Sequence, residues 1–224
     1  MISIVVPVLG RSHQIAPLLE SIASATSVDH EIVFVCSPND IAARKECESS
    51  SSRTLVTTWP PGAGDFARKM GYAYAETDGE WIFQGATDIE FSAGWDIAAL
   101  GVAAETGASV IGTNDEGNPS VIAGKHSTHT LISRSYCDHP GASMDGPGTV
   151  FSLEYAHNWT DSELVGVAKS RGVWAFSRES VVRHNHVHWG RSEMDSTYNL
   201  GLSTFGRDRI TFNRRRMLWA KPTR

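Results

Sequence analysis

The sequence has few cysteines, no excess of positive charge and no apolar run long enough to cross a membrane. Its 224 residues contain three cysteines, Cys36, Cys47 and Cys137, and no Cys-x-x-Cys pair. Three thiols cannot all pair with one another, so we expect reduced cysteines and a cytoplasmic protein. The net charge of −5 argues against nucleic acid as a partner, because nucleic-acid-binding proteins usually carry a basic surface. The first apolar run, 2-ISIVVPVL-9, is too short for a transmembrane segment and lacks the basic start of a signal peptide.

Apolar runs alternate with helical patterns along the first half of the chain. Strands are predicted at residues 2–8, 31–36, 54–59 and 80–83, and helices at residues 12–25 and 65–76. This alternation predicts an α/β fold with βαβ units and a mostly parallel central sheet. Ligands of such sheets bind beyond the carboxyl ends of the strands, so the segments that follow strands are the first candidates for a site.

The second half of the chain is less regular and is expected to form a smaller, mixed region. The predicted elements are a strand at 109–113, a helix at 161–172 with Asp161 as its N-cap, and strands at 173–177 and 180–188. Residues 113–159 are rich in Gly, Pro, His and Ser, and we expect a long loop there.

These patterns predict a single domain over residues 1–206. Its first half, 1–112, would bind a ligand at the sheet edge, and its second half, 113–206, would complete the site. A basic tail is expected over residues 207–224, where the segment 207-RDRITFNRRR-216 carries five arginines against one aspartate.

Two carboxylates follow the apolar run 81-WIF-83 in the stretch 84-QGATDIEF-91. Oxygen ligands suit Mg²⁺ and Mn²⁺, and one or two carboxylates can hold such an ion while leaving positions for phosphate oxygens. Asp88 is therefore predicted to be a metal ligand, and Glu90 shares its strand parity. The alternative is that Asp88 is a turn residue that caps the next helix.

Three histidines occur at a spacing of two in 184-HNHVHWG-190. Residues two apart in an extended segment share one face, and neutral imidazole is a common metal ligand. His186 is the first candidate for such a ligand and His184 the second. The alternatives are a zinc site built from all three histidines, or hydrogen-bonded surface histidines on an edge strand.

Five segments carry a resemblance to a known family: 4-IVVPVLGR-11, 64-GDFARKMGYAYAETDGEWIF-83, 86-ATDIEFSAGW-95, 158-NWTDSEL-164 and 182-VRHNHVHWG-190. In this order they resemble the family 2-type glycosyltransferases, in particular compact bacterial or bacteriophage members. The resemblance implies a GT-A fold, which is a Rossmann-like nucleotide-sugar-binding domain. It also implies a hexosyltransferase-type enzyme that moves a sugar from a nucleoside-diphosphate sugar to an acceptor hydroxyl with inversion. The implied cofactors are that donor and a divalent metal, Mn²⁺ or Mg²⁺.

The sequence departs from the family pattern in two places. Ala86 stands at the first position of the family's Asp-x-Asp motif, and Thr87 stands where many relatives carry an acid. Cys36 and Ser37 follow the second strand, where relatives often have an acidic pair that reads the base, and Asp40 lies nearby. The identity of the base is therefore left open.

The resemblance also implies roles for individual residues. It makes Asp161 the catalytic base that takes the proton of the acceptor hydroxyl. The donor-binding residues that it implies are Pro7, Leu9, Arg11, Asp40, Arg68, Thr87 and Asp88. The acceptor-side residues are Asn114, Asp115 and Glu163. From the residues alone, Asp161 is equally explained as a simple N-cap and Arg68 as part of a solvated helix face.

The expected acceptor is a protein side chain, a glycan or a lipid-linked sugar. If the chain is phage-encoded, it would act in the cytoplasm of a bacterial host. Two other functions remain open at this point. One is a nucleotidyltransferase, although 7-PVLGRSHQ-14 is a poor match to the Gly-rich, basic loop of that class. The other is a non-catalytic nucleotide- or sugar-binding module that has lost the first acid of the Asp-x-Asp motif.

Overall fold

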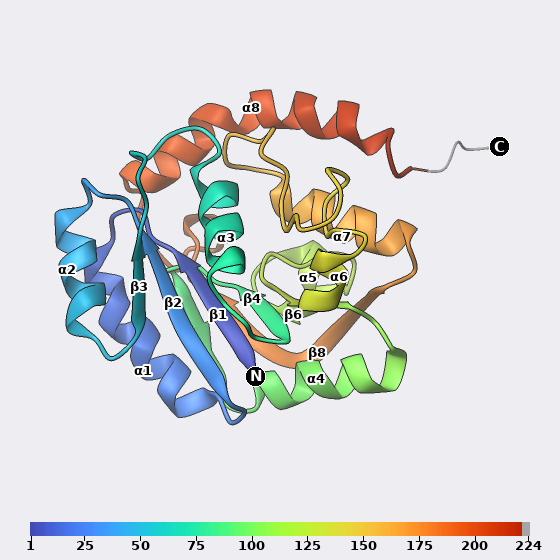
Figure 1. Cartoon of the computed structure of the whole chain (residues 1–224), viewed down its shortest axis with the longest axis horizontal. Helices are drawn as coiled ribbons and strands as arrows, with labels where there is room; N and C mark the ends of the chain where they lie inside the picture. The colour runs from blue at the N-terminus through green and yellow to red at the C-terminus, as the bar shows by residue number, and fades with distance from the viewer. Residues whose placement is uncertain (221–224) are drawn as a thin grey trace.

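An eight-stranded sheet runs through the middle of the computed structural model, which describes residues 1–220 (Figure 1). The strands are β1 (Ile2–Pro7), β2 (His30–Cys36), β3 (Arg53–Val56), β4 (Trp81–Gln84), β5 (Ile89–Phe91), β6 (Val110–Asn114), β7 (Thr130–Ser133) and β8 (Trp174–His184). The α-helices are α1 (Ile15–Ala25), α2 (Ile41–Ser49), α3 (Asp65–Ala75), α4 (Trp95–Thr106), α5 (Pro119–Ile122), α6 (Arg134–Asp138), α7 (Thr160–Ser170) and α8 (Ser196–Arg216). Two short 3-10 helices are η1 (Ser12–Gln14) and η2 (Val187–Trp189).

The strands lie in the order β3-β2-β1-β4-β7-β6-β8-β5. The pairs β1–β2, β1–β4, β2–β3 and β6–β8 are parallel, whereas β7 and β5 are antiparallel to their neighbours. The mostly parallel α/β fold predicted from the sequence is therefore confirmed. In this arrangement β1, β2 and β4 end at one edge of the sheet, which places the segments after Pro7 and Gln84 close together.

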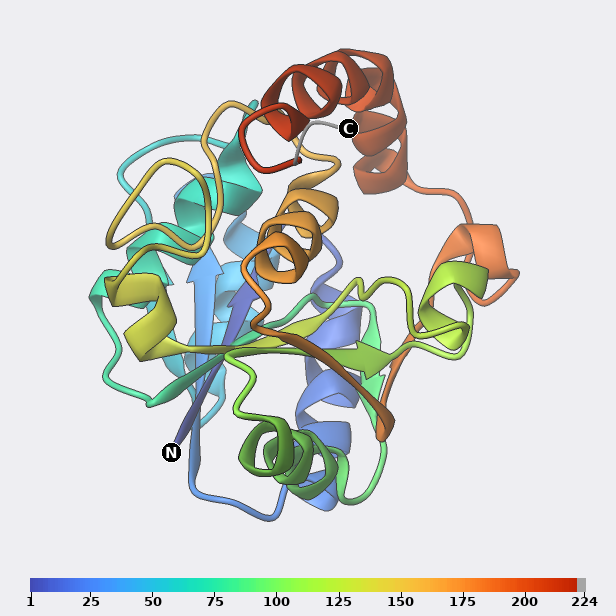
Figure 2. The same cartoon turned by 90° about the vertical axis from the view of Figure 1, so that its right-hand side faces the viewer.

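Helices cover both faces of the sheet, as Figure 2 shows, and this explains the continuous apolar run of β1. Val6 packs with α1, α2 and α4 on one face, and Val5 packs with α3, α6 and α7 on the other. Both valines are completely buried. On the first face, the Phe83 and Trp95 rings lie 4.7 Å apart, centroid to centroid. Full burial of a side chain such as Phe83 contributes about 1.5–3 kcal/mol.

Residues 113–159 do not form the single long loop that their composition predicts. They contain α5, β7 and α6, and β7 pairs with both β4 and β6 in the centre of the sheet. Glycine and proline serve there as turn and helix-start residues: Asn118 caps α5 ahead of Pro119. The segment is therefore part of the scaffold on which the site is built.

Three predicted boundaries are wrong. Helix α7 begins at Thr160, and its N-cap is Trp159 in a left-handed conformation (φ 69°), not Asp161. The two strands predicted after it form one strand, β8, whose pairing with β6 shifts register between Gly112 and Asn114. The expected tail from residue 207 is helical as far as Arg216, because α8 continues through the boundary at 206/207. Its last residues, 221–224, lie outside the described part of the chain.

Helix α8 packs over α7 through polar contacts (Figure 1). The Asp208 carboxylate is completely buried and accepts the backbone N–H groups of Ala156, His157 and Asn158 at 2.8 Å each. The Arg215 guanidinium is also buried and forms an ion pair with Glu163 at 2.6 Å. These contacts fix the segment before α7, which forms part of the cavity described below. Within residues 1–220, no helix combines the length and the apolar character needed to cross a membrane.

Candidate functional site

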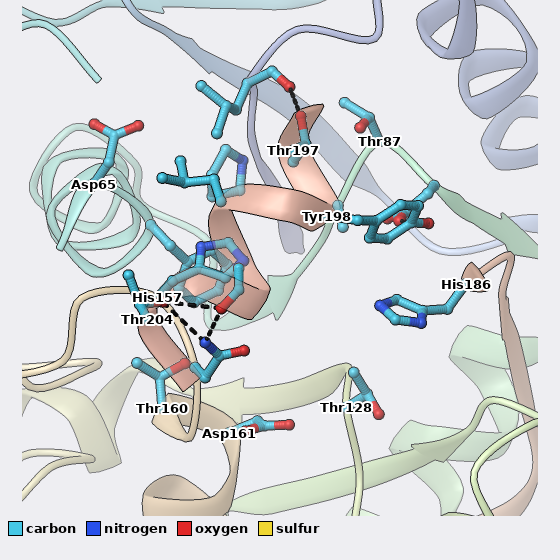
Figure 3. A pocket seen from close by; sticks show the side chains of 18 of the residues that line it. Asp65, Thr87, Thr128, His157, Thr160, Asp161, His186, Thr197, Tyr198 and Thr204 are labelled. Carbon is cyan, nitrogen blue, oxygen red and sulfur yellow. Dashed lines mark hydrogen bonds between the residues drawn. The ribbon is translucent and has the colours of Figure 1, made fainter. Parts of the chain in front are cut away.

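A cavity of about 620 Å³ opens beyond the carboxyl ends of β1 and β4 (Figure 3). Its wall is formed by the segment after β1, the β4–β5 turn, the start of α3, Asn118, the two residues before β7, residues 156–162, the end of β8 with η2, and the first turns of α8. Cavities of this size are typical of small-molecule and cofactor sites. The edge of the sheet that the sequence indicated therefore contains a cavity large enough for a small-molecule ligand.

Eight of the predicted site residues line this cavity: Pro7, Leu9, Arg11, Thr87, Asp88, Asp161, His184 and His186. They come from four separate segments of the chain, and the parallel sheet brings the first two of these segments together. Five other predicted residues do not line it: Asp40, Arg68, Asn114, Asp115 and Glu163.

The two outlying donor-side residues have partners outside the cavity wall. The Asp40 carboxylate accepts the backbone N–H of Gly10 at 2.6 Å and so holds the loop after β1. The Arg68 guanidinium lies over the Trp59 ring, 5.0 Å from its centroid. The next residue, Lys69, points the other way: it is buried and bonds the Val8 carbonyl at 2.6 Å. A helix exposes neighbouring residues on different faces, and Lys69 rather than Arg68 faces the cavity.

The three outlying acceptor-side residues have structural partners. Asn114 donates a hydrogen bond to the Arg178 carbonyl. Asp115 is buried and accepts the hydroxyl proton of Thr128 at 3.0 Å, in addition to two backbone N–H groups of its own turn. Glu163 forms the buried pair with Arg215 already described. Each of these contacts uses the polar atoms that a ligand would need.

Asp88 stands at the centre of a polar cluster on the cavity wall. Its Oδ2 atom lies 2.7 Å from Nη1 of Arg11, 2.9 Å from the Tyr198 hydroxyl and 3.5 Å from Nε2 of His184. Burial of the Asp88 carboxyl opposes its ionisation, but His184, Arg11 and Tyr198 together hold its pKa well below the usual range. Asp88 is therefore an anion at neutral pH. Glu90 is exposed and pairs with Arg183 at 3.3 Å, so it does not join this cluster.

Arg11 connects the cluster to the start of α8. Its guanidinium bonds the Asp195 carboxylate at 2.6 Å and lies over the Tyr198 ring, 4.0 Å from the centroid. Asp195 is the N-cap of α8 and also accepts the Tyr198 N–H at 2.9 Å. The cationic side chain beside Asp88 is thus held in place by a residue that lies 184 positions later in the chain.

The side chains around Asp88 are of chemical types that bind divalent ions. Asp88 supplies a carboxylate, and His184 and His186 supply imidazoles on the same wall. Burial of the His186 ring, together with repulsion from His184, lowers its pKa to about 4, so its ring is neutral at pH 7, and its Nδ1 lone pair accepts the His188 N–H at 3.2 Å. Within residues 1–220, however, no three His, Cys, Asp or Glu side chains are grouped so that they could hold a metal ion. Arg11 holds the Asp88 oxygen that an ion would need.

Asp161 lies in the first turn of α7, across the cavity from Tyr198 and His186 (Figure 3). One carboxylate oxygen is 3.1 Å from Nε2 of His126, and the other accepts the Ser162 N–H at 2.7 Å. Burial raises the pKa of Asp161, but the His126 hydrogen bond and charge and the Ser162 N–H outweigh this and lower it. The positive end of the helix dipole also favours the anion. A carboxylate base is therefore available at the cavity wall.

Several residues of the site were missed by the sequence reasoning. Tyr198 and Thr197 come from α8, where the stretch 195-DSTY-198 carries an N-cap signal that predicts a helix start but not its position in space. His126 partners Asp161, and the surrounding stretch 125-KHSTHT-130 had received no role. The Asp65–Lys69 pair, 2.7 Å apart at i,i+4, was readable as a helix pair but not as part of a cavity wall.

Solved structures with a similar fold are glycosyltransferases. The chain is similar to mannosyltransferase PcManGT from Pyrobaculum calidifontis in complex with GDP-Man and Mn²⁺, with a TM-score of 0.64 and 16% identity over 82% of this chain and 56% of that chain. It is also similar to glucosyl-3-phosphoglycerate synthase from Mycobacterium tuberculosis in complex with phosphoglyceric acid, with a TM-score of 0.64 and 15% identity over 96% of this chain and 80% of that one. For S. aureus TarS 1–349 the TM-score is 0.58 and the identity 12%, over 82% and 60% of the two chains.

These likenesses confirm the predicted GT-A-type fold. The chain spans little more than half of the mannosyltransferase and of TarS 1–349. No protein-family model matches the sequence, and no curated protein matches it significantly.

Proposed function

We propose that this chain is a glycosyltransferase that moves a sugar from a nucleoside-diphosphate sugar to an acceptor hydroxyl, with inversion at the anomeric carbon. One observation carries the proposal: a single cavity holds an Arg11–Asp88–histidine cluster on one wall and the Asp161 carboxylate on another. It lies at the edge of the sheet where α/β folds bind their ligands. The similar structures include a mannosyltransferase with GDP-Man and TarS with UDP-GlcNAc, which supports the class of donor.

The cluster around Asp88 suits the diphosphate of the donor. Arg11 offers a guanidinium whose fork matches phosphate oxygens, and Asp195 keeps it at the cavity. A divalent ion bound at Asp88 would offset the negative charge that develops on the leaving diphosphate. Asp88, His184 and His186 are the residues that would hold it. The loop residues Pro7 and Leu9 border the same end of the cavity and would flank the nucleotide.

Asp161 suits the role of the base. In the proposed reaction the acceptor oxygen forms a bond to the anomeric carbon and its proton passes to Asp161. The bond between that carbon and the diphosphate breaks, and its electron pair stays on the diphosphate oxygen. Attack from the side opposite the leaving group inverts the carbon. The ionised state of Asp161, favoured by His126 and the α7 terminus, keeps it ready to accept this proton. The proposed acceptors are a protein side chain, a glycan or a lipid-linked sugar.

Donor turnover tests the proposal. The protein would be incubated with GDP- and UDP-sugars, Mn²⁺ or Mg²⁺ and a panel of hydroxyl acceptors, and the release of nucleoside diphosphate would be measured. Loss of a general base reduces turnover by about 10²–10⁴-fold, so Asp161→Asn should do so while binding the donor as tightly as the wild type. The exposed carboxylate of Asp78 lies outside the cavity, and Asp78→Asn serves as the matched control. Equal losses of turnover and donor binding in Asp161→Asn would instead assign it a structural role at the start of α7.

A further inference from the structure

The outer face of α8 carries apolar side chains that are exposed to solvent. Ile210 and Met217 are 72% and 77% exposed, which makes them the most exposed large apolar side chains of residues 1–220. Met217 directly follows α8 and keeps its helical backbone conformation. The two residues are seven apart, which is about two helical turns, so they lie on one face of the helix. The opposite face holds the buried Asp208 and Arg215, so Ile210 and Met217 point away from the molecule (Figure 2).

Exposed arginines flank this apolar pair on both sides. Helical spacing places Arg207 and Arg214 on one side of the pair, and Arg209 and Arg216 on the other. The only acidic residue of α8 is Asp208, which is buried and accepts backbone N–H groups. Within residues 1–220, Arg214 pairs with Glu154, and the other three exposed arginines have no ion pair. The outer face of α8 is therefore positive, although the chain as a whole has a net charge of −5.

The combination of apolar and basic side chains indicates which partner this face fits. Helices that lie in a membrane interface have apolar side chains in the acyl boundary and Lys or Arg side chains beside them. The apolar stem of an arginine can follow such a boundary while its guanidinium stays at the headgroups. A soluble polyanion would leave Ile210 and Met217 in water, and a second copy of the same face would bring arginines against arginines. Anionic lipid headgroups match both the charge and the apolar pair.

The first turns of the same helix form part of the cavity mouth. Leu200, Leu202 and Phe205 line the cavity and are also exposed to solvent. The Phe205 ring packs against the Trp159 ring next to α7, with 5.4 Å between the centroids. A chain that is docked through α8 therefore has its cavity mouth beside the lipid surface.

We propose that the outer face of α8 docks this chain on an anionic lipid membrane. Ile210 and Met217 insert among the headgroups, and the four exposed arginines contact lipid phosphates. An arginine close to an anionic membrane surface raises the partition coefficient about fivefold. Burial of an isoleucine side chain raises it about tenfold or more. Docking requires neither donor nor acceptor, so it does not depend on the transferase proposed above.

Vesicle flotation of the full chain without donor tests this proposal. The vesicles consist of phosphatidylglycerol with phosphatidylcholine, or of phosphatidylcholine alone, each at low and at high salt. The informative variant is Arg209→Gln with Ile210→Ser, because neither residue lines the cavity. The matched control is Arg178→Gln with Ile97→Ser, which removes the same two types of exposed side chain from β8 and α4. Helix α4 lies on the other side of the molecule from α8 (Figure 1).

We expect the wild type to bind the phosphatidylglycerol vesicles, more weakly at high salt, and to bind phosphatidylcholine alone at least ~tenfold more weakly. The partition coefficient of the α8 variant should be at least ~tenfold lower than that of the wild type, and that of the control variant should be unchanged. Both variants should keep the wild-type midpoint of thermal unfolding, because the replaced side chains are exposed.

No binding of the wild type to the anionic vesicles, or equal partition coefficients for the α8 variant and its control, overturns the proposal. Ile210→Ser alone must also weaken binding. If it binds as tightly as the wild type, charge alone holds the chain, and the face is one for soluble polyanions instead. Vesicle binding without donor turnover overturns only the proposed transferase, and donor turnover without vesicle binding overturns only this inference.

Discussion

Replacing Arg215 by alanine should destabilise the protein far more than replacing its neighbour Arg216. The Arg215 side chain is 3% exposed, and its guanidinium bonds both carboxylate oxygens of Glu163, which is 2% exposed. It also pairs with Glu154 and Asp145, whose side chains are 41% and 35% exposed. Among residues 1–220, alanine at 215 leaves the Glu163 carboxylate buried with only the Tyr155 hydroxyl as a side-chain donor.

The magnitude follows from the difference between these partners. Removing one member of a buried ion pair costs about 3–5 kcal/mol, because the other charge stays buried without compensation. The two half-exposed partners add only about 0–1 kcal/mol each. For a chain of this length, 1 kcal/mol corresponds to a change in Tm of about 2–4 °C, so the expected fall in Tm is about 6–20 °C. Arg216 is exposed, and Arg216→Ala should change the free energy of unfolding by about 0.5 kcal/mol or less.

Urea unfolding followed by circular dichroism measures both variants against the wild type. Similar free energies of unfolding for Arg215→Ala and Arg216→Ala would refute the reasoning. So would a double variant, Arg215→Ala with Glu163→Gln, that is no more stable than Arg215→Ala alone, because it removes the charge to which the cost is assigned.

Three further predictions concern the cavity. Arg11→Gln removes a charged hydrogen bond of about 1.5–3 kcal/mol to Asp88, so calorimetry should find that the variant binds a divalent ion at least ~tenfold more tightly and nucleoside diphosphate more weakly. Unchanged metal affinity would show that the Arg11 guanidinium and the metal ion do not compete for Asp88. Burial lowers the pKa of His126, but its bond to Asp161 raises that pKa overall, so wild-type turnover should rise with pH through a midpoint above 6.5. The same rise of turnover with pH in His126→Asn would contradict this. Asp208→Asn leaves three buried N–H groups with weaker acceptors and should lower the free energy of unfolding in urea by about 1–3 kcal/mol. An unchanged free energy of unfolding would contradict the role of α8 in supporting the cavity wall.

The pH prediction depends on the charges around His126. Besides Asp161, its ring is influenced by Asp115, which favours the charged ring, and by Lys169, which opposes it. A protonated His126 lowers the pKa of Asp161 and makes it a weaker base. Loss of the His126 proton at higher pH therefore makes Asp161 a stronger base. Lys169→Met should therefore move the midpoint to higher pH, and a shift to lower pH would contradict the assignment.

The sequence was sufficient to predict the parts of the fold that depend on local patterns. Residues 2–8 have apolar side chains on both strand faces, and a strand covered on both sides buries such side chains, as the structure does for all of these residues except Pro7. The edge rule for parallel sheets then placed Arg11 and Asp88 together, and they form an ion pair. Both predictions rest on periodicity and topology, which are readable without knowledge of distant contacts.

The remaining parts depend on pairs that are far apart in the chain. Tyr198 and Asp88 are 110 residues apart, Arg215 and Glu163 are 52 apart, and His126 and Asp161 are 35 apart. Helix α8 buries Tyr198, Gly201, Asp208 and Arg215, which give no apolar stripe, so its place over the cavity had no local signal. Glu163 illustrates the consequence: its position near Asp161 favoured an acceptor-side role, but its partner comes from α8.

The binding of nucleoside diphosphates tests the central claim most directly. The midpoint of thermal unfolding would be measured with GDP, UDP and the other nucleoside diphosphates, each with Mn²⁺ or with EDTA. A ligand at 100 times its Kd stabilises the native state by about 2.7 kcal/mol, which corresponds to a rise of about 5–11 °C for a chain of this size. We predict such a rise for one base, dependent on Mn²⁺ and reduced in Asp88→Asn. No rise with any nucleoside diphosphate, with or without the ion, would contradict the assignment of the cavity as a donor site.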